Sequence, residues 1–174
     1  MKLLKTMKDS DFFETTSKES LDNNKIARTA VRAVLYNSQN QIALVGGTYV
    51  VLPGGGMEAG ENYEQSVRRE VLEEVGCEIQ NLKELGKTIE HRDKAGGIQE
   101  SYCFIAKVEK DGIPTTAQHD EVGMKITWCF IDEALDILDK QFKLLSPDNY
   151  HAYFNIEVSK TFLNEAKNVN KDVS

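Results

Sequence analysis

The sequence is poor in the residues and segments that mark several classes of protein. It contains three cysteines in 174 residues, and their wide separation lacks the paired spacing of a zinc site. No segment approaches the roughly 20 consecutive apolar residues that span a membrane. The net charge of −7 at pH 7 lacks the basic excess of proteins that bind nucleic-acid duplexes. We therefore predict reduced cysteines, a cytoplasmic location, no membrane span and no duplex partner.

The rest of the composition is typical of one folded domain. Hydrophobic residues make up 40% of the chain and charged residues 28%, with only three prolines. A single domain typically holds roughly 100 to 200 residues. We predict one domain at residues 26–174, preceded by an N-terminal extension at residues 1–25, where no sustained periodicity occurs. Three scattered histidines are assigned no metal: His91, His119 and His151.

Short apolar runs separated by turn residues predict several β-strands. The strands are expected at residues 28–36, 41–45, 49–52, 82–91, 100–108 and 125–131. The first two runs flank a polar turn, and the fourth and fifth flank Lys94-Ala-Gly-Gly, so that two β-hairpins are predicted. Because hairpins are antiparallel and helical segments are interleaved with the strands, we predict an α/β fold with a mixed sheet.

A helix is predicted between Asn62 and Gly76. Asn62 suits the N-cap, Gln65 occupies the capping-box position three residues later, and Gly76 suits the C-terminal stop. Valines at every fourth residue form an apolar stripe on this helix: Val67, Val71 and Val75. Two further helices are expected at residues 132–138, capped by Asp132, and at residues 149–167, where aromatic residues predict core or homodimer contacts.

Three glutamates on the predicted helix present an electrostatic problem. Glu70, Glu73 and Glu74 stand at positions i, i+3 and i+4, and like charges at that spacing destabilise a helix. A divalent cation would neutralise them. On a helical wheel Glu74 lies closest to the valine stripe, with Glu70 and Glu73 further round, so that Glu74 needs a partner.

These glutamates belong to a longer pattern of spaced glycine, glutamate and arginine residues. The pattern reads Gly55-x5-Glu61-x7-Arg69-Glu70-Val71-x-Glu73-Glu74-x-Gly76-Cys77. It resembles the signature of the Nudix hydrolases of the MutT-like kind, and all the fixed polar and glycine positions match. The one departure is Cys77, where the family usually has an aliphatic residue, and a buried cysteine behaves as a small hydrophobe. We refer to residues 55–77 as the box.

The resemblance implies a fold, a reaction and a set of residue roles. It implies a mixed β-sheet sandwiched between helices (α/β/α), and cleavage of a pyrophosphate bond in a nucleoside diphosphate linked to another moiety, with Mg²⁺ or Mn²⁺ as the cofactor. Glu70, Glu73, Glu74 and the carbonyl of Gly54 would hold the metal. Arg69 would orient Glu73. The remaining roles go to Gly55, which would brace the loop, and to Glu61, which would brace the loop or a second metal.

Two kinds of role stay open at this point. The general base is either a box glutamate or an acidic residue of a distant loop, for which Glu121 is the candidate and Asp120 its rival. For substrate binding, Arg28 and Arg32 could hold phosphate groups, although a plain surface pair is an alternative. Tyr49 could stack on a base or pack against neighbouring residues.

The partner implied by these residues is a small phosphorylated nucleotide. We expect a nucleoside triphosphate, including oxidised ones, as the substrate. An ADP-ribose or nucleotide-sugar pyrophosphatase is one alternative. A Nudix module that senses a nucleotide without cleaving it is another, although the complete set of box glutamates favours an enzyme.

Overall fold

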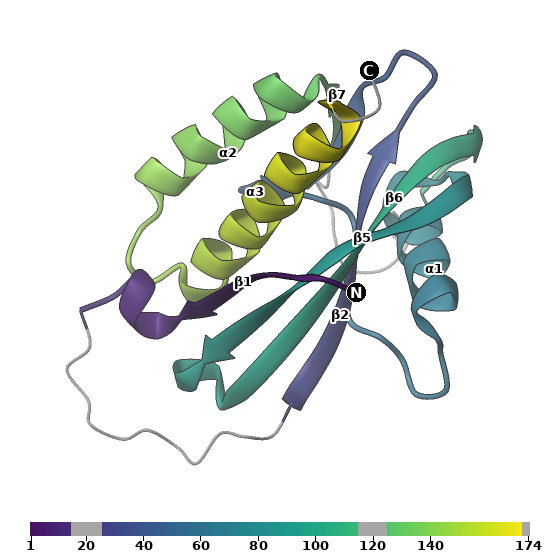
Figure 1. Cartoon of the computed structure of the whole chain (residues 1–174). Helices are drawn as coiled ribbons and strands as arrows, with labels where there is room; N and C mark the ends of the chain where they lie inside the picture. The colour runs from purple at the N-terminus through teal and green to yellow at the C-terminus, as the bar shows by residue number, and fades with distance from the viewer. Residues whose placement is uncertain (15–25, 115–124, 172–174) are drawn as a thin grey trace.

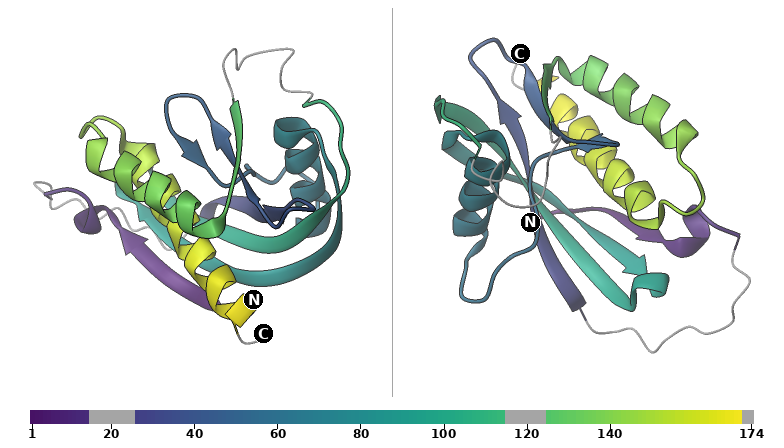
Figure 2. Two further views of the ribbon diagram at one scale, coloured as in Figure 1. Left: turned by 90° about the horizontal axis from the view of Figure 1, so that it is seen from above. Right: turned by 180° about the vertical axis from the view of Figure 1, so that it is seen from behind.

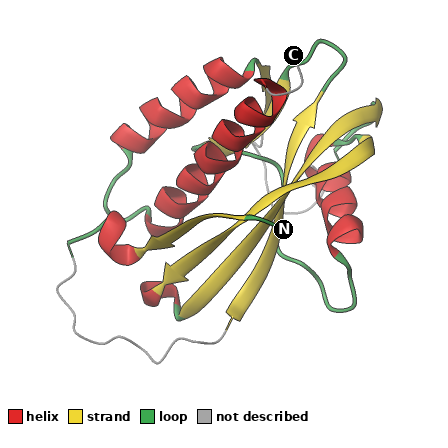
Figure 3. Cartoon of the chain, in the orientation of Figure 1, coloured by secondary structure: helices red, strands yellow, loops and turns green. Residues whose placement is uncertain are grey.

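The computed structural model describes residues 1–14, 26–114 and 125–171, and a mixed β-sheet forms the centre of this part of the chain (Figures 1 and 2). The strands are β1 (Leu3–Lys8), β2 (Ile26–Tyr36), β3 (Ile42–Gly46), β4 (Val50–Val51), β5 (Glu78–Arg92), β6 (Gly97–Lys110) and β7 (Lys125–Cys129). The α-helices are α1 (Tyr63–Val75), α2 (Ile131–Leu144) and α3 (Tyr150–Lys171), and two short 3₁₀ turns are η1 (Asp9–Asp11) and η2 (Asp93–Ala95). Figure 3 shows the helices on both sides of the sheet, which confirms the predicted α/β/α architecture.

The order of strands across the sheet is β1-β5-β6-β2-β3-β4, with β7 paired to β3. The predicted β5–β6 hairpin is antiparallel, whereas β2 runs parallel to β6 from Ile26 opposite Ile98 to Tyr36 opposite Lys107. The predicted first hairpin is paired only next to its turn, between Tyr36 and Ile42. Beyond that point β3 leaves β2 to pair with β4 and β7. This divergence leaves one edge of β2 free for another segment.

Two apolar cores lie on opposite faces of the sheet. Alternate residues of β2 point to opposite faces, and Val31 and Leu35 pack with Val67 and Val71 of α1. On the other face Val34 packs with apolar residues of α3. The three cysteines are free thiols in these cores, as predicted. Within the described ranges, no helix combines the length and apolar character needed to cross a membrane.

The N-terminal residues contribute a strand that the sequence analysis did not predict. β1 pairs in parallel with β5, from Leu3 opposite Lys87 to Lys8 opposite His91. Only Met7 of this strand is buried, so the strand lacks the alternation by which strands are found in a sequence. After β1, Phe12 and Phe13 pack against aromatic residues of α2 and α3. Residues 1–14 of the predicted extension therefore dock on the domain, with β1 as part of its sheet.

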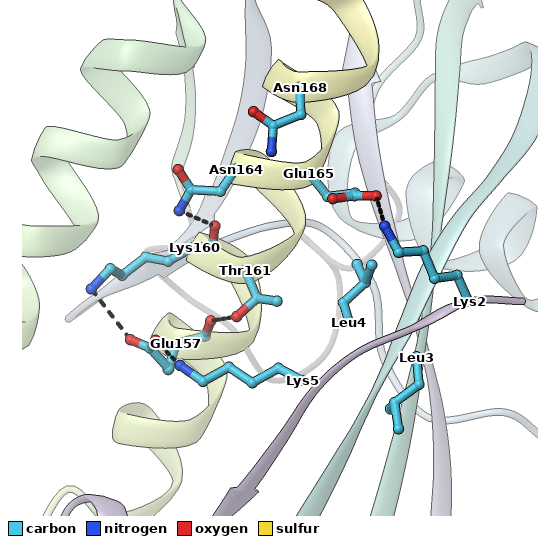
Figure 4. A pocket seen from close by; sticks show the side chains of 10 residues that line it. All are labelled: Lys2, Leu3, Leu4, Lys5, Glu157, Lys160, Thr161, Asn164, Glu165 and Asn168. Carbon is cyan, nitrogen blue, oxygen red and sulfur yellow. Dashed lines mark hydrogen bonds and ion pairs between the residues drawn. The ribbon is translucent and has the colours of Figure 1, made fainter.

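A groove between β1 and α3 is crossed by ion pairs (Figure 4). Lys2 pairs with Glu165 at 2.9 Å, and Lys5 pairs with Glu157 at 2.6 Å. Lysines also blunt the exposed edge of a strand against pairing with another chain. We interpret the ion pairs across this groove as contacts that hold the edge strand β1 against α3.

The predicted helices exist, but α2 and α3 extend beyond their predicted C-terminal ends, to Leu144 and Lys171. In α1, the Asn62 side chain accepts from the Gln65 amide at 2.9 Å, and Gly76 ends the helix, as predicted. The prediction that Asp132 caps the next helix is wrong. Phe130 is the N-cap residue of α2, and its amide donates to Glu133 at 3.0 Å. Asp132 lies inside the helix and pairs with a lysine of α3.

Candidate functional site

The loop before α1 fills the free edge of β2. The amide of Val31 donates to the carbonyl of Gly55 at 2.9 Å, and the amide of Ala33 donates to the carbonyl of Pro53 at 3.0 Å. Gly54 has a φ of +135°, and a Cβ added there would lie 2.2 Å from the carbonyl oxygen of Val31. Only glycine tolerates this backbone and this close approach. The loop is therefore held on the sheet by backbone contacts.

Gly55 brings the loop against Glu70, the first of the three glutamates at positions i, i+3 and i+4. A Cβ added to Gly55 would lie 2.6 Å from both carboxylate oxygens of Glu70. Glu70 is 8% exposed, and its burial raises its pKa, while Arg69 opposes that shift. The helical wheel predicted that Glu74 would lie nearest the core, but Glu70 is the more buried residue. The helical wheel takes account of the helix alone, whereas Glu70 is covered by the loop that precedes the helix.

Arg69 connects the box loop to the helix. Its guanidinium donates to Glu61 at 2.7 and 3.1 Å, to Glu70 at 2.8 Å, to Glu73 at 3.1 Å and to the carbonyl of Gly56 at 3.0 Å. Its hydrogen bonds to Glu61 are the largest cause of a raised pKa for Arg69. The structure thus places Arg69 in contact with the glutamate that it was predicted to orient, and with the predicted loop brace.

The pKa of Glu61 is lowered to about 2, first by its hydrogen bond with Arg69 and then by the backbone amide of Glu58. A carboxylate whose pKa is lower in the folded state stabilises the protein above its ordinary pKa and loses that effect as the pH falls through the folded value. We expect wild type to be more stable than Glu61→Gln near pH 6. The difference should shrink between about pH 4.5 and 2. Denaturant unfolding of both proteins across this range measures it, and a difference that grows on acidification would contradict the assignment.

Glu70, Glu73 and Glu74 all have partners within the site. Glu70 and Glu73 contact Arg69, and Glu74 accepts from the amide of Gly54 at 2.8 Å. In residues 1–14, 26–114 and 125–171, no three acidic, histidine or cysteine side chains converge closely enough to hold a metal ion. The donors are nevertheless carboxylates and a loop carbonyl, which is the chemistry that Mg²⁺ and Mn²⁺ prefer. The chemical nature of these donors therefore fits Mg²⁺ or Mn²⁺.

The two arginines of β2 lie in different surroundings. Arg32 is 5% exposed, which excludes the surface alternative for it, and its guanidinium donates to the carbonyls of Gly54 and of Val31. Its Nε atom is buried without a hydrogen-bond partner among the described residues, and burial lowers its pKa. Arg28 is exposed, and a Cβ added to Gly56 would lie 3.2 Å from its Nη2 atom. Arg28 therefore lies directly against the box loop.

The structure does not place all of the remaining predicted site residues beside the box loop. Tyr49 is half-buried and packs against the core between the sheet and α3. Glu121 and its rival Asp120 lie outside the described residues, so the loop candidates for the general base stay predictions.

A pocket of about 190 Å³ adjoins the box loop at Arg28. Its lining comes from the start of β2, the tip of the β5–β6 hairpin and the first turn of α3: Ala27, Arg28, Arg92, Ala95, Gly97, Ile98, Gln99 and His151. We call this the Arg28 pocket. Sequence reasoning missed Arg92 and Gln99, and assigned His151 no role. The sequence signal that could have found Arg92 and Gln99 was the alternation of polar residues on both sides of the predicted hairpin turn. Residues that alternate in this way lie on one face of the sheet.

Comparisons with known proteins agree with this geometry. The family model described as the NUDIX domain matches residues 27–153. NAD-capped RNA hydrolase NudC of Pasteurella multocida is 46% identical over 59 residues, which are 34% of this chain and 21% of that protein. The same protein of Haemophilus influenzae is 43% identical over 53 residues, 30% of this chain and 20% of the relative. The matched stretch thus spans about a fifth of the length of these relatives.

Solved structures of MutT proteins share the fold. One, from work on MutT of Aliivibrio salmonicida and Vibrio cholerae, has a TM-score of 0.51 at 20% identity, and covers 63% of this chain and 83% of that one. MutT of Bacillus halodurans has a TM-score of 0.50 at 24% identity, with coverage of 63% and 72%. At these identities the likeness establishes the architecture and leaves the substrate open.

Proposed function

Since this chain belongs to the NUDIX family, we propose that it is a metal-dependent hydrolase that cleaves a pyrophosphate bond in a nucleoside diphosphate linked to another moiety. The observation that carries the proposal is the contact set of Arg69, which gathers Glu61, Glu70 and Glu73 against the box loop. The hydrolase names of the partial relatives and the shared MutT fold support the same class of enzyme.

We propose that Glu70, Glu73, Glu74 and the carbonyl of Gly54 would hold Mg²⁺ or Mn²⁺. When bound, such a cation supplies charge neutralisation for the phosphate oxygens. Arg32 donates to the carbonyl of Gly54, and it would hold this carbonyl in place and donate to a phosphate oxygen beside it.

The remaining residues would act through position and charge. Arg69 would hold Glu70 and Glu73 in place, and Glu61 would in turn hold Arg69 and the amide of Glu58. Arg28 would donate to a phosphate group, because the guanidinium fork matches phosphate oxygens. The proton of the attacking water would pass to a box glutamate or to Glu121, with Asp120 as the rival of Glu121.

The substrate that we propose is a small nucleotide, a nucleoside triphosphate or an oxidised one. ADP-ribose and nucleotide sugars are the alternative class. Two arginines, Arg28 and Arg92, line the pocket beside the loop and suit a phosphorylated ligand of either kind. The NudC relatives are named for NAD-capped RNA, so dinucleotides belong among the candidates to be tested.

A panel of nucleotides tests the proposal. Wild-type protein with Mg²⁺ is expected to release a nucleoside monophosphate from at least one of a set of nucleoside triphosphates, oxidised triphosphates, ADP-ribose, nucleotide sugars and dinucleotides, as followed by chromatography of the products. With EDTA in excess the rate should fall by about 100-fold or more, because a bound cation contributes several kcal/mol to phosphate chemistry. Mg²⁺ added back should restore it. Equal rates with and without EDTA would contradict the metal site.

A further inference from the structure

The Arg28 pocket lies next to the box but is formed by different residues. Its lining residue Arg28 also lies against the box loop, at Gly56, and none of the box glutamates lines the pocket. Its volume of about 190 Å³ is several times the roughly 30 Å³ share of one liquid water. The pocket therefore extends the site beyond the loop, with room for a small chemical group.

A buried carboxylate already neutralises one of the arginines at this pocket. Glu90 is fully buried and forms an ion pair with Arg92. Three neighbouring side chains also donate to Glu90: Thr88 at 3.1 Å, Gln99 at 3.2 Å and Ser101 at 2.6 Å. The oxygens of Glu90 are thus taken up by β5 and β6, and this carboxylate has little capacity to compensate a further cation.

Two more arginines lie on the same face of the sheet without such a partner. Arg32 donates only to backbone carbonyls, and its Nε atom is an unpaired buried donor among the described residues. Its surroundings include Glu74 and Glu90 as anions, and Arg28 and Arg92 as cations. Arg28 makes no ion pair with a carboxylate of the described residues. Burying the charge of Arg32 without a paired anion is costly, whereas Arg28 is exposed, so that its guanidinium is open to a ligand in the pocket.

His151 is the remaining titratable residue that lines the pocket. His151 lies 3.4 Å from Arg92 through its Nδ1 atom. Its pKa is lowered first by partial burial and then by the charges of Arg92 and Arg28. The charges of both arginines therefore reach the imidazole at this pocket.

We propose that the Arg28 pocket binds an anionic group, a phosphate monoester or a carboxylate, carried by the substrate beyond the pyrophosphate bond that is cleaved. This rests on the proposed function. The class of substrate is then a nucleotide conjugate with a second anionic centre, and Arg28 is the residue that selects it, because guanidinium pairs with both kinds of oxyanion in a bidentate manner.

The N-terminal segment, outside the matched family region, holds two walls of this pocket. Asp9 accepts from the hydroxyl of Tyr150 at 2.5 Å and from the amide of Lys94 at 3.2 Å. These residues precede His151 and Ala95, which line the pocket on α3 and on the hairpin tip. A pocket whose walls are held before binding loses less entropy when a ligand enters.

Matched pairs of substrates test the selectivity. The full-length protein with Mg²⁺ would be assayed on NADH and NADPH, which differ by one phosphate, and on UDP-glucose and UDP-glucuronate, which differ by one carboxylate. We expect kcat/KM to be at least about 10-fold higher for the more anionic member of one pair, and that pair identifies the group. Arg28→Gln should abolish the preference. Arg68→Gln, which changes an exposed arginine of α1 that pairs with Glu64, should retain it.

A binding measurement separates this inference from the proposed reaction. In EDTA, inorganic phosphate titrated into the protein should shift the side-chain Nε–H signals of Arg28 and Arg92 saturably, and Arg28→Gln should weaken that binding at least about 5-fold. Equal kcat/KM within both pairs, or a preference that survives Arg28→Gln, would overturn the inference and leave the hydrolase intact. Hydrolysis of none of the panel would contradict the proposed function. In that case the phosphate titration tests anion binding in the Arg28 pocket without any reaction, and absence of saturable binding overturns the inference.

Discussion

The Glu73→Gln, Glu74→Gln double variant is expected to hydrolyse the preferred substrate about 1,000-fold more slowly than wild type, with its fold retained. Both side chains are half-buried and lie at the box loop, where Glu74 accepts from Gly54 and Glu73 from Arg69. An amide of the same shape keeps part of these contacts but removes the negative charge that would hold a cation. A bound cation contributes several kcal/mol to such a reaction, and about 1.4 kcal/mol changes a rate tenfold.

Two controls accompany this measurement. Glu64→Gln changes an exposed glutamate of the same helix, one that pairs with Arg68, and should leave kcat within about twofold. Circular dichroism and the unfolding midpoint of the double variant should match wild type. Retention of full activity by the double variant would remove the box glutamates from the mechanism. If wild type itself binds a nucleotide tightly but releases no product, the chain is a sensor.

Replacing Arg69 by alanine should have the second-largest effect, on activity and stability together. The substitution leaves Glu61 and Glu70 without their main hydrogen-bond donor, and Glu70 is buried beneath the loop. A buried charge that loses its partner costs up to several kcal/mol. Because Arg69 is partly exposed, solvent screening reduces that cost, and we expect the free energy of unfolding to fall by about 2 kcal/mol. The rate should fall by about 100-fold as Glu70 and Glu73 lose their fixed positions.

The neighbouring Arg68 provides the matched control for this second variant. It is exposed and pairs with Glu64 on the surface of α1, and such pairs contribute little. Arg68→Ala should change the free energy of unfolding by less than about 1 kcal/mol and leave kcat near the wild-type value. If Arg69→Ala is as stable and as active as Arg68→Ala, the contacts of Arg69 at the loop do not hold the site together.

The parts of the fold that the sequence predicted well are those with local causes. The cap at Asn62, the valine stripe and the stop at Gly76 all act within α1, and the helix has the predicted bounds. The role of Arg69 beside Glu73, four residues later on the same helix, has the same local cause, and the two side chains are in contact. The strand β1 depends instead on pairing with β5, far along the chain, and its own residues carry no alternation.

The site beyond the box depends on contacts that no short pattern contains. Glu70 is buried because Gly55 brings a loop over it, and a helical wheel has no information about that loop. The Arg28 pocket combines β2, the β5–β6 hairpin and α3. Polar residues such as Glu90 and Gln99 resemble the solvated face of a strand until α3 is packed above them. Their role follows from tertiary structure.

The most direct test of the proposed reaction is hydrolysis by wild-type protein in water enriched in ¹⁸O, with mass spectrometry of both products. The account predicts that, with Mg²⁺, one phosphate-bearing product gains a single ¹⁸O atom, because water attacks a phosphorus of the pyrophosphate bond and that bond breaks. When EDTA removes the metal, labelled product should form about 100-fold more slowly or slower still. Tight binding of a nucleotide without any labelled product across the whole panel would contradict it.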